Sequence, residues 1–327
     1  LDHVPALRWI ITTRADPPLP LGRLRARGQL LELRSADLRF TPAETAQFFN
    51  EVMQIVLPPE AVQKLAAHTE GWVTGLQLAA LAMQNSPDRA AFIRDFSGSH
   101  RYVADYLADE VLSQLPAATQ HFLLHTSILE RMCAELCDAI LRGEGEETLP
   151  SRSFLLTHTP TQPILEELER ANLFLIPLDG ERRWYRYHHL FADLLQQRLQ
   201  RRHPQLASEL HRRAARWFAQ HGLIEDAIRH TITGQDFAQA ADLLEQHHET
   251  FWMQGRFVTL QHWLNALPDA VKQPRPRLLL ALAWTHFLTD SPAATLNALL
   301  QAAETAIVAA DATRGMQQSP TTTELLG

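Results

Sequence analysis

Lysine, cysteine and long apolar runs are all scarce in this chain of 327 residues. Its only lysines are Lys64 and Lys272, and neither follows a glycine, so the phosphate loop G-x-x-x-x-G-K-[ST] is absent. That loop supplies the backbone amides and the ammonium group that hold the phosphates of a nucleotide. We therefore do not expect this chain alone to hydrolyse ATP at a normal rate.

Several classes of protein are disfavoured by other absences. Two cysteines provide no disulfide framework, which makes the reducing cytoplasm the expected location. No run of about 18 apolar residues exists, so we expect neither a membrane span nor a membrane partner. A net charge of −7 argues against a general nucleic-acid binder. The first residue is Leu1 rather than Met, and a strand-like segment follows at once, so we expect a chain cut inside a domain.

Short apolar runs near the N-terminus predict strands, and the rest of the chain is predominantly helical in pattern. "LRWIITTR" (7–14) and "LLEL" (30–33) are typical of buried strands. "TPAET" predicts the start of a helix, because Thr41 can cap, Pro42 suits the first turn and Glu44 completes a capping box. The fold class is therefore mainly α.

One β-hairpin is predicted between residues 172 and 189. "NLFLIPL" and "RRWYRYHH" flank Asp179-Gly180, a dipeptide that suits a tight turn between strands. A helix follows, and its apolar residues share one face: Leu190, Phe191, Leu194, Leu195 and Leu199. Several helices followed by a two-stranded ribbon are typical of a winged-helix domain with its wing.

From about residue 205 the pattern is of paired helices. Turns are predicted at Gly222 and Gly234, and the period of about 35–40 residues is typical of tetratricopeptide-like hairpins. Such repeats bury their apolar faces by stacking and can present a concave binding surface. Trp252, Trp263 and Trp284 are candidates for lining that surface, although aromatic residues at helical spacing more often belong to a core.

Two residues are candidates for phosphate contact. Arg14 stands at the carboxyl end of the first predicted strand, where open α/β sheets bind ligands and a guanidinium can meet a phosphate; the alternative is a solvated arginine. His188 lies where the second hairpin strand meets a helix, and a helix N-terminus attracts anions. From the local sequence alone, His188 and His189 are more simply explained as structural residues of the hairpin.

Two further patterns are weaker. His121 and His125, like Cys133 and Cys137, are spaced i, i+4 and could share a helical face, but no zinc motif results, so we predict no metal site. Residues 182–216 carry nine arginines against Asp193 and Glu209. Such a stretch beside a winged helix suggests DNA binding, but pairing with acidic neighbours within the chain is the simpler explanation.

Taken in order, four segments resemble one family. They are "ITTRADPPLPLGRLRARGQLLELRSADLRFTPAE", "TEGWVTGLQLAALAM", "RYVADYLADEVLSQLP" and "ANLFLIPLDGERRWYRYHHLFADLLQQRL". In this order they resemble the MalT-like, LuxR-type large ATP-dependent transcriptional regulators, which are signal-transduction ATPases with numerous domains. The resemblance extends to about residue 300. It implies four domains: the last part of a nucleotide-binding α/β domain (1–36), a helical lid (37–96), a winged-helix domain (97–203) and incomplete tetratricopeptide-like repeats (204–327). The chain is then expected to be truncated at both ends.

The resemblance also assigns roles to three residues. It implies that Arg14 senses the terminal phosphate of ATP and that His188 touches the phosphate of bound ADP in a closed state. It also implies that Gln77 packs by the adenine, since Gln77 lies in the matching lid segment. The family often has a proline at this place, so the sequence departs from the family pattern there. ATP or ADP, with Mg²⁺, is the cofactor implied for the intact protein, and we predict no catalytic residue within this chain.

The implied partners follow from the same family. They are an inducer, either a small molecule or a protein, on the helical repeats, further copies of the protein on activation, and DNA through a C-terminal helix-turn-helix that this sequence lacks. Two alternatives remain open. One is a helical-repeat scaffold that binds a partner protein, and the other is a signalling ATPase of the same superfamily with a different, non-transcriptional effector.

Overall fold

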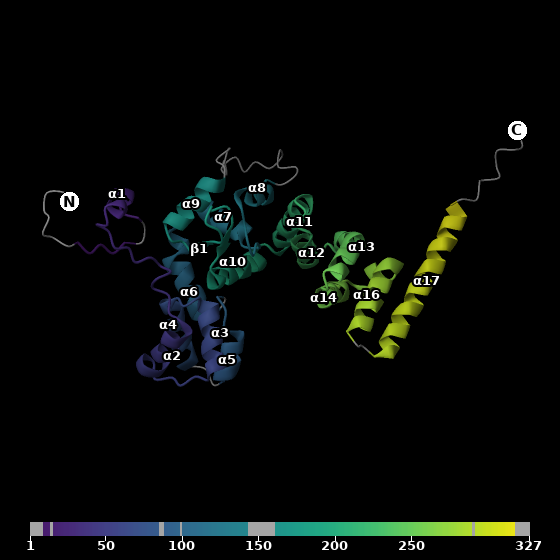
Figure 1. The fold of residues 1–327 in the computed structure, drawn as a ribbon, viewed down its shortest axis with the longest axis horizontal. Coiled ribbons are helices and arrows are strands. Elements are labelled where there is room, and N and C mark those ends of the chain that lie inside the picture. The colour runs from purple at the N-terminus through teal and green to yellow at the C-terminus, as the bar shows by residue number, and fades with distance from the viewer. Residues whose placement is uncertain are drawn as a thin grey trace, which may run out of the picture. The chain divides into compact units, whose positions relative to one another are not determined.

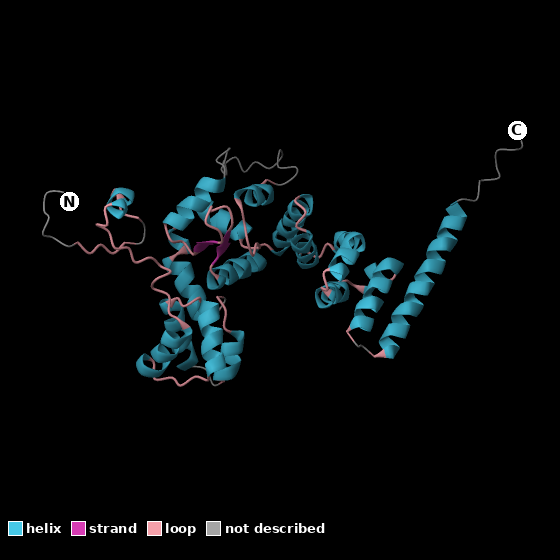
Figure 2. Ribbon diagram, in the orientation of Figure 1, coloured by secondary structure: helices cyan, strands magenta, loops and turns pink. Residues whose placement is uncertain are grey.

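The structure of this chain is a computed structural model. It describes residues 9–13, 16–84, 88–98, 100–142, 161–289 and 292–317, and it describes side chains up to residue 309. Helices dominate the described part, whose one sheet has two strands (Figure 2). The predicted mainly α fold class is therefore confirmed. The chain divides into two compact units, Leu1–Pro204 and Gln205–Gly327.

The first unit runs from α1 to α10 in Figure 1. Its elements are α1 (Leu21–Ala26), α2 (Pro42–Gln47), the π-helix η1 (Phe48–Val52), α3 (Pro59–Thr69), α4 (Val73–Gln84), α5 (Arg89–Asp95), α6 (Arg101–Glu110), the 3-10 helix η2 (Leu112–Gln114), α7 (Ala117–Thr126), α8 (Ala134–Leu141), α9 (Thr161–Arg170), β1 (Leu175–Pro177), β2 (Tyr185–Tyr187) and α10 (His189–Arg202). We call α2 to α5 the lid helices and α6 to α10 the winged-helix part.

The segments predicted as N-terminal strands are not strands in the described structure. Among the described residues, 9–13 and 30–33 belong to no β-strand, and Ile10 is 94% exposed. A β-strand is stabilised by hydrogen bonds and side-chain contacts with a neighbouring strand, and apolar residues alone do not supply them. The strand prediction is therefore wrong for the described parts of these two segments.

The helix start predicted at residues 41–45 is confirmed by α2. In the capping box of α2, the Glu44 N–H donates to Thr41 Oγ1 (3.2 Å) and the Thr41 N–H donates to Glu44 Oε2 (2.9 Å). Pro42 occupies the first turn, as expected. The lid helices bury large apolar side chains against one another, including Phe49, Leu65, Leu76, Met83 and Phe96.

The wing of the winged-helix part is the predicted hairpin with a different turn. Leu175 pairs with Tyr187 and Pro177 with Tyr185, in antiparallel register. The positive backbone angle (φ 56°) falls on Arg182 instead of Gly180, so the connection is longer than a two-residue turn. Its geometry is stabilised by the Asp179 carboxylate, which accepts hydrogen bonds from the N–H groups of the following loop.

Helix α10 packs its predicted apolar face inward. All five residues predicted for that face are buried: Leu190, Phe191, Leu194, Leu195 and Leu199. The first turn of α10 comes very close to Gly98, whose N–H donates to Asp193 Oδ2 at 3.0 Å. A Cβ atom on Gly98 would lie 1.7 Å from the Leu190 carbonyl oxygen, so only glycine permits this approach.

The described residues of the second unit are predominantly helical. The helices are α11 (Pro204–Gln220), α12 (Ile224–Thr233), α13 (Phe237–Met253), α14 (Phe257–Ala266), α15 (Asp269–Lys272), α16 (Pro276–Leu288) and α17 (Ala293–Gln317). Gly222, at the predicted turn, has a φ of +72°, and Asp236 caps α13 by accepting from the Gln239 N–H. Helices α12 and α13 pack on each other, as do α16 and α17.

Two histidines connect α11 and α12. His211 Nδ1 lies 2.8 Å from His230 Nδ1, and the His230 ring stacks on Phe218 with ring centroids 5.2 Å apart. Burial lowers the pKa of His211 to about 4, and burial together with His211 and Arg229 lowers the pKa of His230 to about 3. Both rings are therefore neutral at neutral pH, and one donates the shared hydrogen bond to the other.

Candidate functional site

Helix α3 ends in a turn, residues 69–72, on which several distant segments converge. Glu70 and Gly71 both have positive φ angles (49° and 71°). The Phe40 N–H donates to the Gly71 carbonyl at 2.8 Å, and a Cβ on Gly71 would lie 2.3 Å from the Phe40 oxygen. Glycine at this position is therefore required by both the backbone angle and the available space. Trp72 follows and turns its ring toward Phe174, with the centroids 5.2 Å apart.

His188 is fixed at the joint between the wing and α10. It is the residue before the helix, and its N–H donates to the Phe174 carbonyl at 2.8 Å. The side chain is almost enclosed, with the residue only 4% exposed, and it contacts the rings of Trp72 and Phe174 edge-on. Its Nε2 atom lies 2.9 Å from the Thr69 carbonyl oxygen. This residue therefore connects the wing to the end of α3.

The surroundings of His188 determine its charge and tautomer. Burial lowers the pKa of His188 to about 4, although the nearby Glu70 carboxylate and the hydrogen bond to Thr69 favour the protonated form. The ring is therefore neutral at neutral pH. A carbonyl oxygen only accepts hydrogen bonds, so the single ring proton is on Nε2. Nδ1 is left as an acceptor that is buried and has no hydrogen-bond partner in the described structure.

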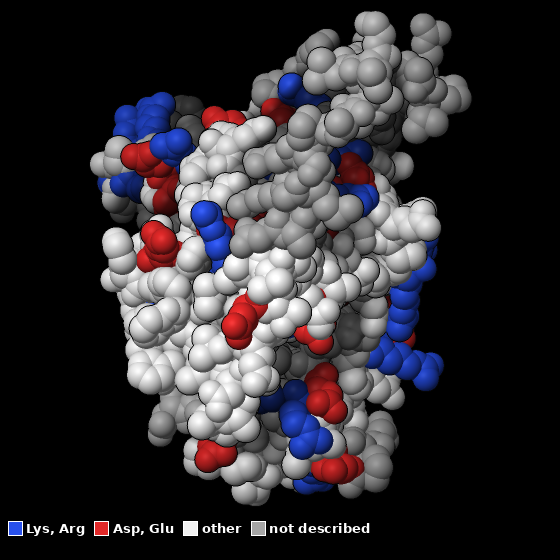
Figure 3. Space-filling view, turned by 90° about the vertical axis from the view of Figure 1, so that its right-hand side faces the viewer, with Lys and Arg blue, Asp and Glu red and all other residues white. Residues whose placement is uncertain are grey.

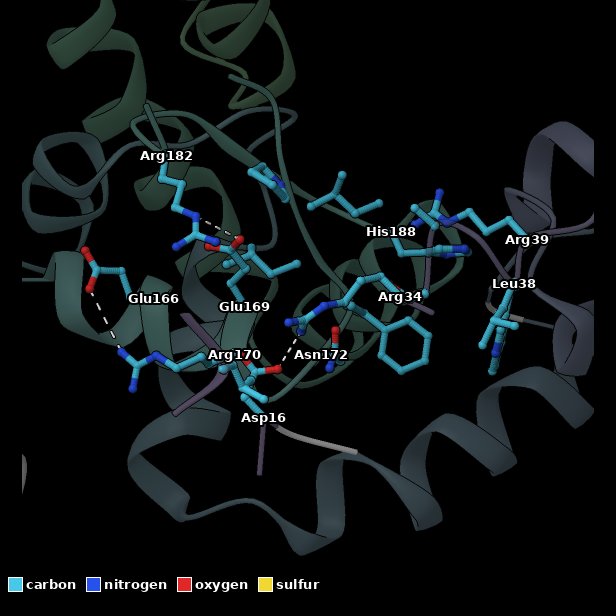
Figure 4. A pocket seen from close by; sticks show the side chains of 18 of the residues that line it. Asp16, Arg34, Leu38, Arg39, Glu166, Glu169, Arg170, Asn172, Arg182 and His188 are labelled. Atoms are coloured by element: carbon cyan, nitrogen blue, oxygen red, sulfur yellow. Dashed lines mark hydrogen bonds and ion pairs between the residues drawn. The ribbon is translucent and has the colours of Figure 1, made fainter. Parts of the chain in front are cut away.

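A cavity of about 1200 Å³ opens beside His188 (Figure 4). Its walls come from the chain before α2, the start of α4, the end of α9, the first hairpin strand and His188 itself. Five arginines and three carboxylates line it: Arg25, Arg34, Arg39, Arg170, Arg182, Asp16, Glu166 and Glu169. The excess of positive charge suits an anionic ligand.

The lining arginines are already paired with carboxylates in the structure. Figure 4 shows three of these ion pairs, which are Arg34 with Asp16, Arg170 with Glu166 and Arg182 with Glu169. A phosphate group would therefore compete with carboxylates for the guanidinium groups. The buried Nδ1 of His188 has no such competitor in the described structure.

The predicted site residues do not all come together. Arg14 lies outside the described residues. Gln77 is exposed on α4 and is not among the residues that line the cavity. His188 does line it. Sequence reasoning missed Glu70 and Trp72, although both belong to the "TEGW" segment, where a carboxylate and an aromatic residue flank a helix-ending glycine.

The second unit has a smaller cavity of about 640 Å³ between α13 and α16. Trp252 and Trp284 both line it, and the Trp252 Nε1–H is buried without a hydrogen-bond partner in the described structure. Trp284 is 54% exposed. Trp263 instead is buried against Phe251, with ring centroids 5.1 Å apart. Of the three candidate tryptophans, two therefore share a cavity and one belongs to a core.

The arginines of the basic stretch are largely engaged with acidic residues in their own unit. In the first unit, Arg186 pairs with Glu70; in the second, Arg212, Arg213 and Arg216 all contact Glu209. Figure 3 shows acidic and basic side chains interspersed on the face that it draws. These contacts favour the simpler explanation of the stretch over a DNA-binding surface.

The weaker metal candidates are packed residues. Cys133 and Cys137 are free and buried, and burial raises the pKa of both thiols. His121 and His125 stack with ring centroids 3.6 Å apart. Among the residues that the structure describes, no group of three or more histidine, cysteine or carboxylate side chains could hold a metal ion.

The comparison with protein families identifies the winged-helix part. Residues 108–207 match the model of the MalT winged helix domain. The HTH-type transcriptional regulator MalT of Klebsiella pneumoniae is 36% identical over 288 residues, which are 87% of this chain and 30% of that protein. This chain is thus MalT-like over most of its length. MalT of Serratia proteamaculans is 35% identical over 317 residues, which are 94% of the MalT-like chain and 32% of that protein.

A relative with a different name matches equally well. The serine/threonine-protein kinase PknK of Mycobacterium tuberculosis is 36% identical over 293 residues, which are 90% of the MalT-like chain and 25% of the kinase. The MalT-like chain thus spans about a quarter to a third of the length of these relatives. Its described helices include none that is both long enough and apolar enough to cross a membrane.

Proposed function

We propose that the MalT-like chain is the nucleotide-sensing and inducer-sensing part of an ATP-dependent transcriptional regulator. In this proposal the four domains have the boundaries 1–36, 37–96, 97–203 and 204–327. ADP binds beside His188 and holds the winged-helix part closed on the lid helices, and exchange for ATP releases it. A ligand shifts such an equilibrium only by contacting the two states differently, and His188 is the contact that distinguishes them.

The observation that carries this proposal is the unpaired Nδ1 atom of His188. A buried polar atom without a partner costs free energy, so it is expected to gain a partner when a ligand fills the cavity beside it. The positive lining of the cavity supports an anionic ligand such as a nucleotide phosphate. Arg14 and Gln77 keep their proposed roles at the terminal phosphate and the adenine. Mg²⁺ is proposed to accompany the nucleotide.

Phosphate contact at Nδ1 requires a proton on that atom, since neutral His188 offers only a lone pair there. A phosphate oxygen beside the ring raises the pKa of His188 by favouring the charged imidazolium. If the bound nucleotide raises this pKa above neutral, each ADP takes up one proton on binding. We therefore expect ADP affinity to increase on acidification from pH 8.5 to 7, by up to about tenfold per pH unit below the pKa that His188 has in the complex; this range lies above the second ionisation of the phosphate near pH 6.

Isothermal titration calorimetry in two buffers of different ionisation enthalpy measures this proton uptake directly. The natural gene product that contains these residues should show about one proton taken up per ADP. The His188→Ala variant should show less uptake at the same pH. Equal proton uptake by both proteins would mean that His188 is not the group that titrates.

We also propose that the cavity between α13 and α16 receives the inducer. Its support is the combination of the exposed Trp284 with the unpartnered indole N–H of Trp252.

The Trp284→Ala change should alter the free energy of unfolding by less than about 0.5 kcal/mol, because the ring is mostly outside the core. Urea denaturation measures this, and a reporter assay should show a lost inducer response. The matched control is Met253→Ala, at the exposed residue next to Trp252. It should leave both the free energy of unfolding and the inducer response unchanged.

A second candidate function is a signalling ATPase with a different effector. The similarity to a protein named as a serine/threonine kinase supports it, because identity and coverage are as high as for the MalT relatives. In that case the same switch would control a catalytic domain. Reading the gene on both sides of this sequence separates the candidates, since a helix-turn-helix downstream supports the regulator and a kinase domain supports the alternative.

A further inference from the structure

The turn after α3 carries a carboxylate that three other parts of the first unit contact. The Glu70 side chain is 7% exposed. Arg186, on β2, donates to both of its oxygens, with distances of 2.7 and 2.9 Å. Arg39, in the segment before α2, donates at 3.0 Å. The backbone N–H of His189, at the start of α10, donates at 3.1 Å.

These donors bring together elements that are distant in sequence. Glu70 and Arg186 are 116 positions apart, and Arg39 precedes Glu70 by 31 positions. Burial by itself would raise the pKa of Glu70. Three interactions outweigh burial: the hydrogen bond from Arg186, the electrostatic attraction of the His188 ring and the hydrogen bond from the His189 N–H. Together they lower the pKa of Glu70 to about 2. The carboxylate is therefore ionised throughout the physiological pH range.

The neighbouring residue provides the anchor of the sensing histidine. Thr69 precedes Glu70, and its carbonyl oxygen accepts the hydrogen bond from His188 Nε2. The Thr69 carbonyl thus holds the ring of His188, while the side-chain carboxylate of the next residue holds the wing arginine. A displacement of the lid helices from the wing would break both sets of contacts together.

We propose that Glu70 is the positioning residue that docks the lid helices on the wing and so holds His188 at the cavity wall. The link to nucleotide sensing rests on the proposed function, whereas the docking role does not. A purely structural ion pair would affect only the stability of the unit. A docking residue also determines how far the lid helices lie from the wing while the protein remains folded.

Double electron–electron resonance on the nucleotide-free chain tests the docking role. Spin labels on Gln63→Cys and Glu181→Cys report the distance from α3 to the wing loop, and both sites are exposed. The native Cys133 and Cys137 are buried, with thiol pKa values raised by burial, so the two introduced thiols react selectively. We expect one narrow distance distribution for the otherwise unchanged chain.

The Glu70→Gln variant should add a second population at longer distance. The matched control is Glu60→Gln, which neutralises an exposed carboxylate at the other end of the same helix and should leave the distribution unchanged. Arg186→Lys keeps the charge but loses the two-point contact, so its second population should be smaller than that of Arg186→Gln. A folded Glu70→Gln chain with the single narrow distribution would overturn the proposal.

If Glu70→Gln fails to fold, the docking role is tested by comparing Arg186→Lys with Arg186→Gln. Equal distributions for these two variants and the unchanged chain would also overturn the docking role. Failure of the nucleotide proposal gives a different pattern, since ADP binding would then be insensitive to His188→Ala while Glu70→Gln still opens the unit.

Discussion

ADP should bind about tenfold to a hundredfold more weakly to the His188→Ala variant of the natural gene product that contains these residues. The change removes one hydrogen bond to a charged group, which is worth about 1.5–3 kcal/mol. It also removes the link between the wing and Thr69, so the closed state loses stability and basal activity should rise. Isothermal titration calorimetry measures the affinity, and a reporter assay measures the basal activity.

The adjacent histidine provides the control for this experiment. The His189 side chain is 62% exposed and does not line the cavity, and its Nδ1 lies 3.2 Å from the Glu70 carboxylate, so His189→Ala should weaken ADP binding less than His188→Ala does. Thermal unfolding of both variants shows whether each remains folded. Equal ADP affinities for the two folded variants and the unchanged protein would contradict a role of His188 in nucleotide binding.

Acidification should destabilise the second unit through the pair of His211 and His230. Their pKa values are lowered to about 4 and about 3 in the folded chain, whereas an unfolded histidine titrates near 6.5. Below pH 6.5 the unfolded chain therefore binds protons that the folded chain excludes. Stability is complete above about pH 6.5 and falls by up to about 1.4 kcal/mol per pH unit for each histidine until the folded pKa values are reached.

Urea denaturation of the whole chain between pH 7 and 4 measures this loss. Besides burial, the ring of His211 and the guanidinium of Arg229 both oppose protonation of His230. His230→Gln removes one titrating ring, so stability should fall less steeply with acidification than in the unchanged chain. His262→Gln, at an exposed position on α14, should keep the original slope. An identical slope in all three proteins would show that the pair does not control acid stability.

Local signals in the sequence predicted much of the fold. The capping box at Thr41 and Glu44 and the apolar face of α10 are both confirmed, because each depends on residues within a few positions of one another. The hairpin is also confirmed, but its turn places Arg182 in the left-handed region instead of Gly180. The side chain of Asp179 stabilises this wider loop, which the turn dipeptide alone does not indicate.

The candidate site was only partly predictable. His188 was recognised by its place between strand and helix and by family resemblance. Its charge state depends on burial and on Thr69, which is 119 positions earlier in the chain. The contact between Glu70 and Arg186 is equally long-range, and no local pattern connects the two residues. The described parts of the strands predicted at 7–14 and 30–33 are not strands for a related reason, since apolar residues form a strand only beside a partner strand.

The protonation of His188 in the presence of ADP tests the central claim most directly. Nitrogen-15 NMR of the histidine-labelled gene product distinguishes a bare ring nitrogen from a protonated one, and comparison with the His188→Ala variant assigns the signal. We predict that Nδ1 of His188 is unprotonated in the free protein and becomes protonated when ADP saturates the site. An Nδ1 signal that stays unprotonated and unshifted at saturating ADP would contradict the proposal that this histidine senses the nucleotide.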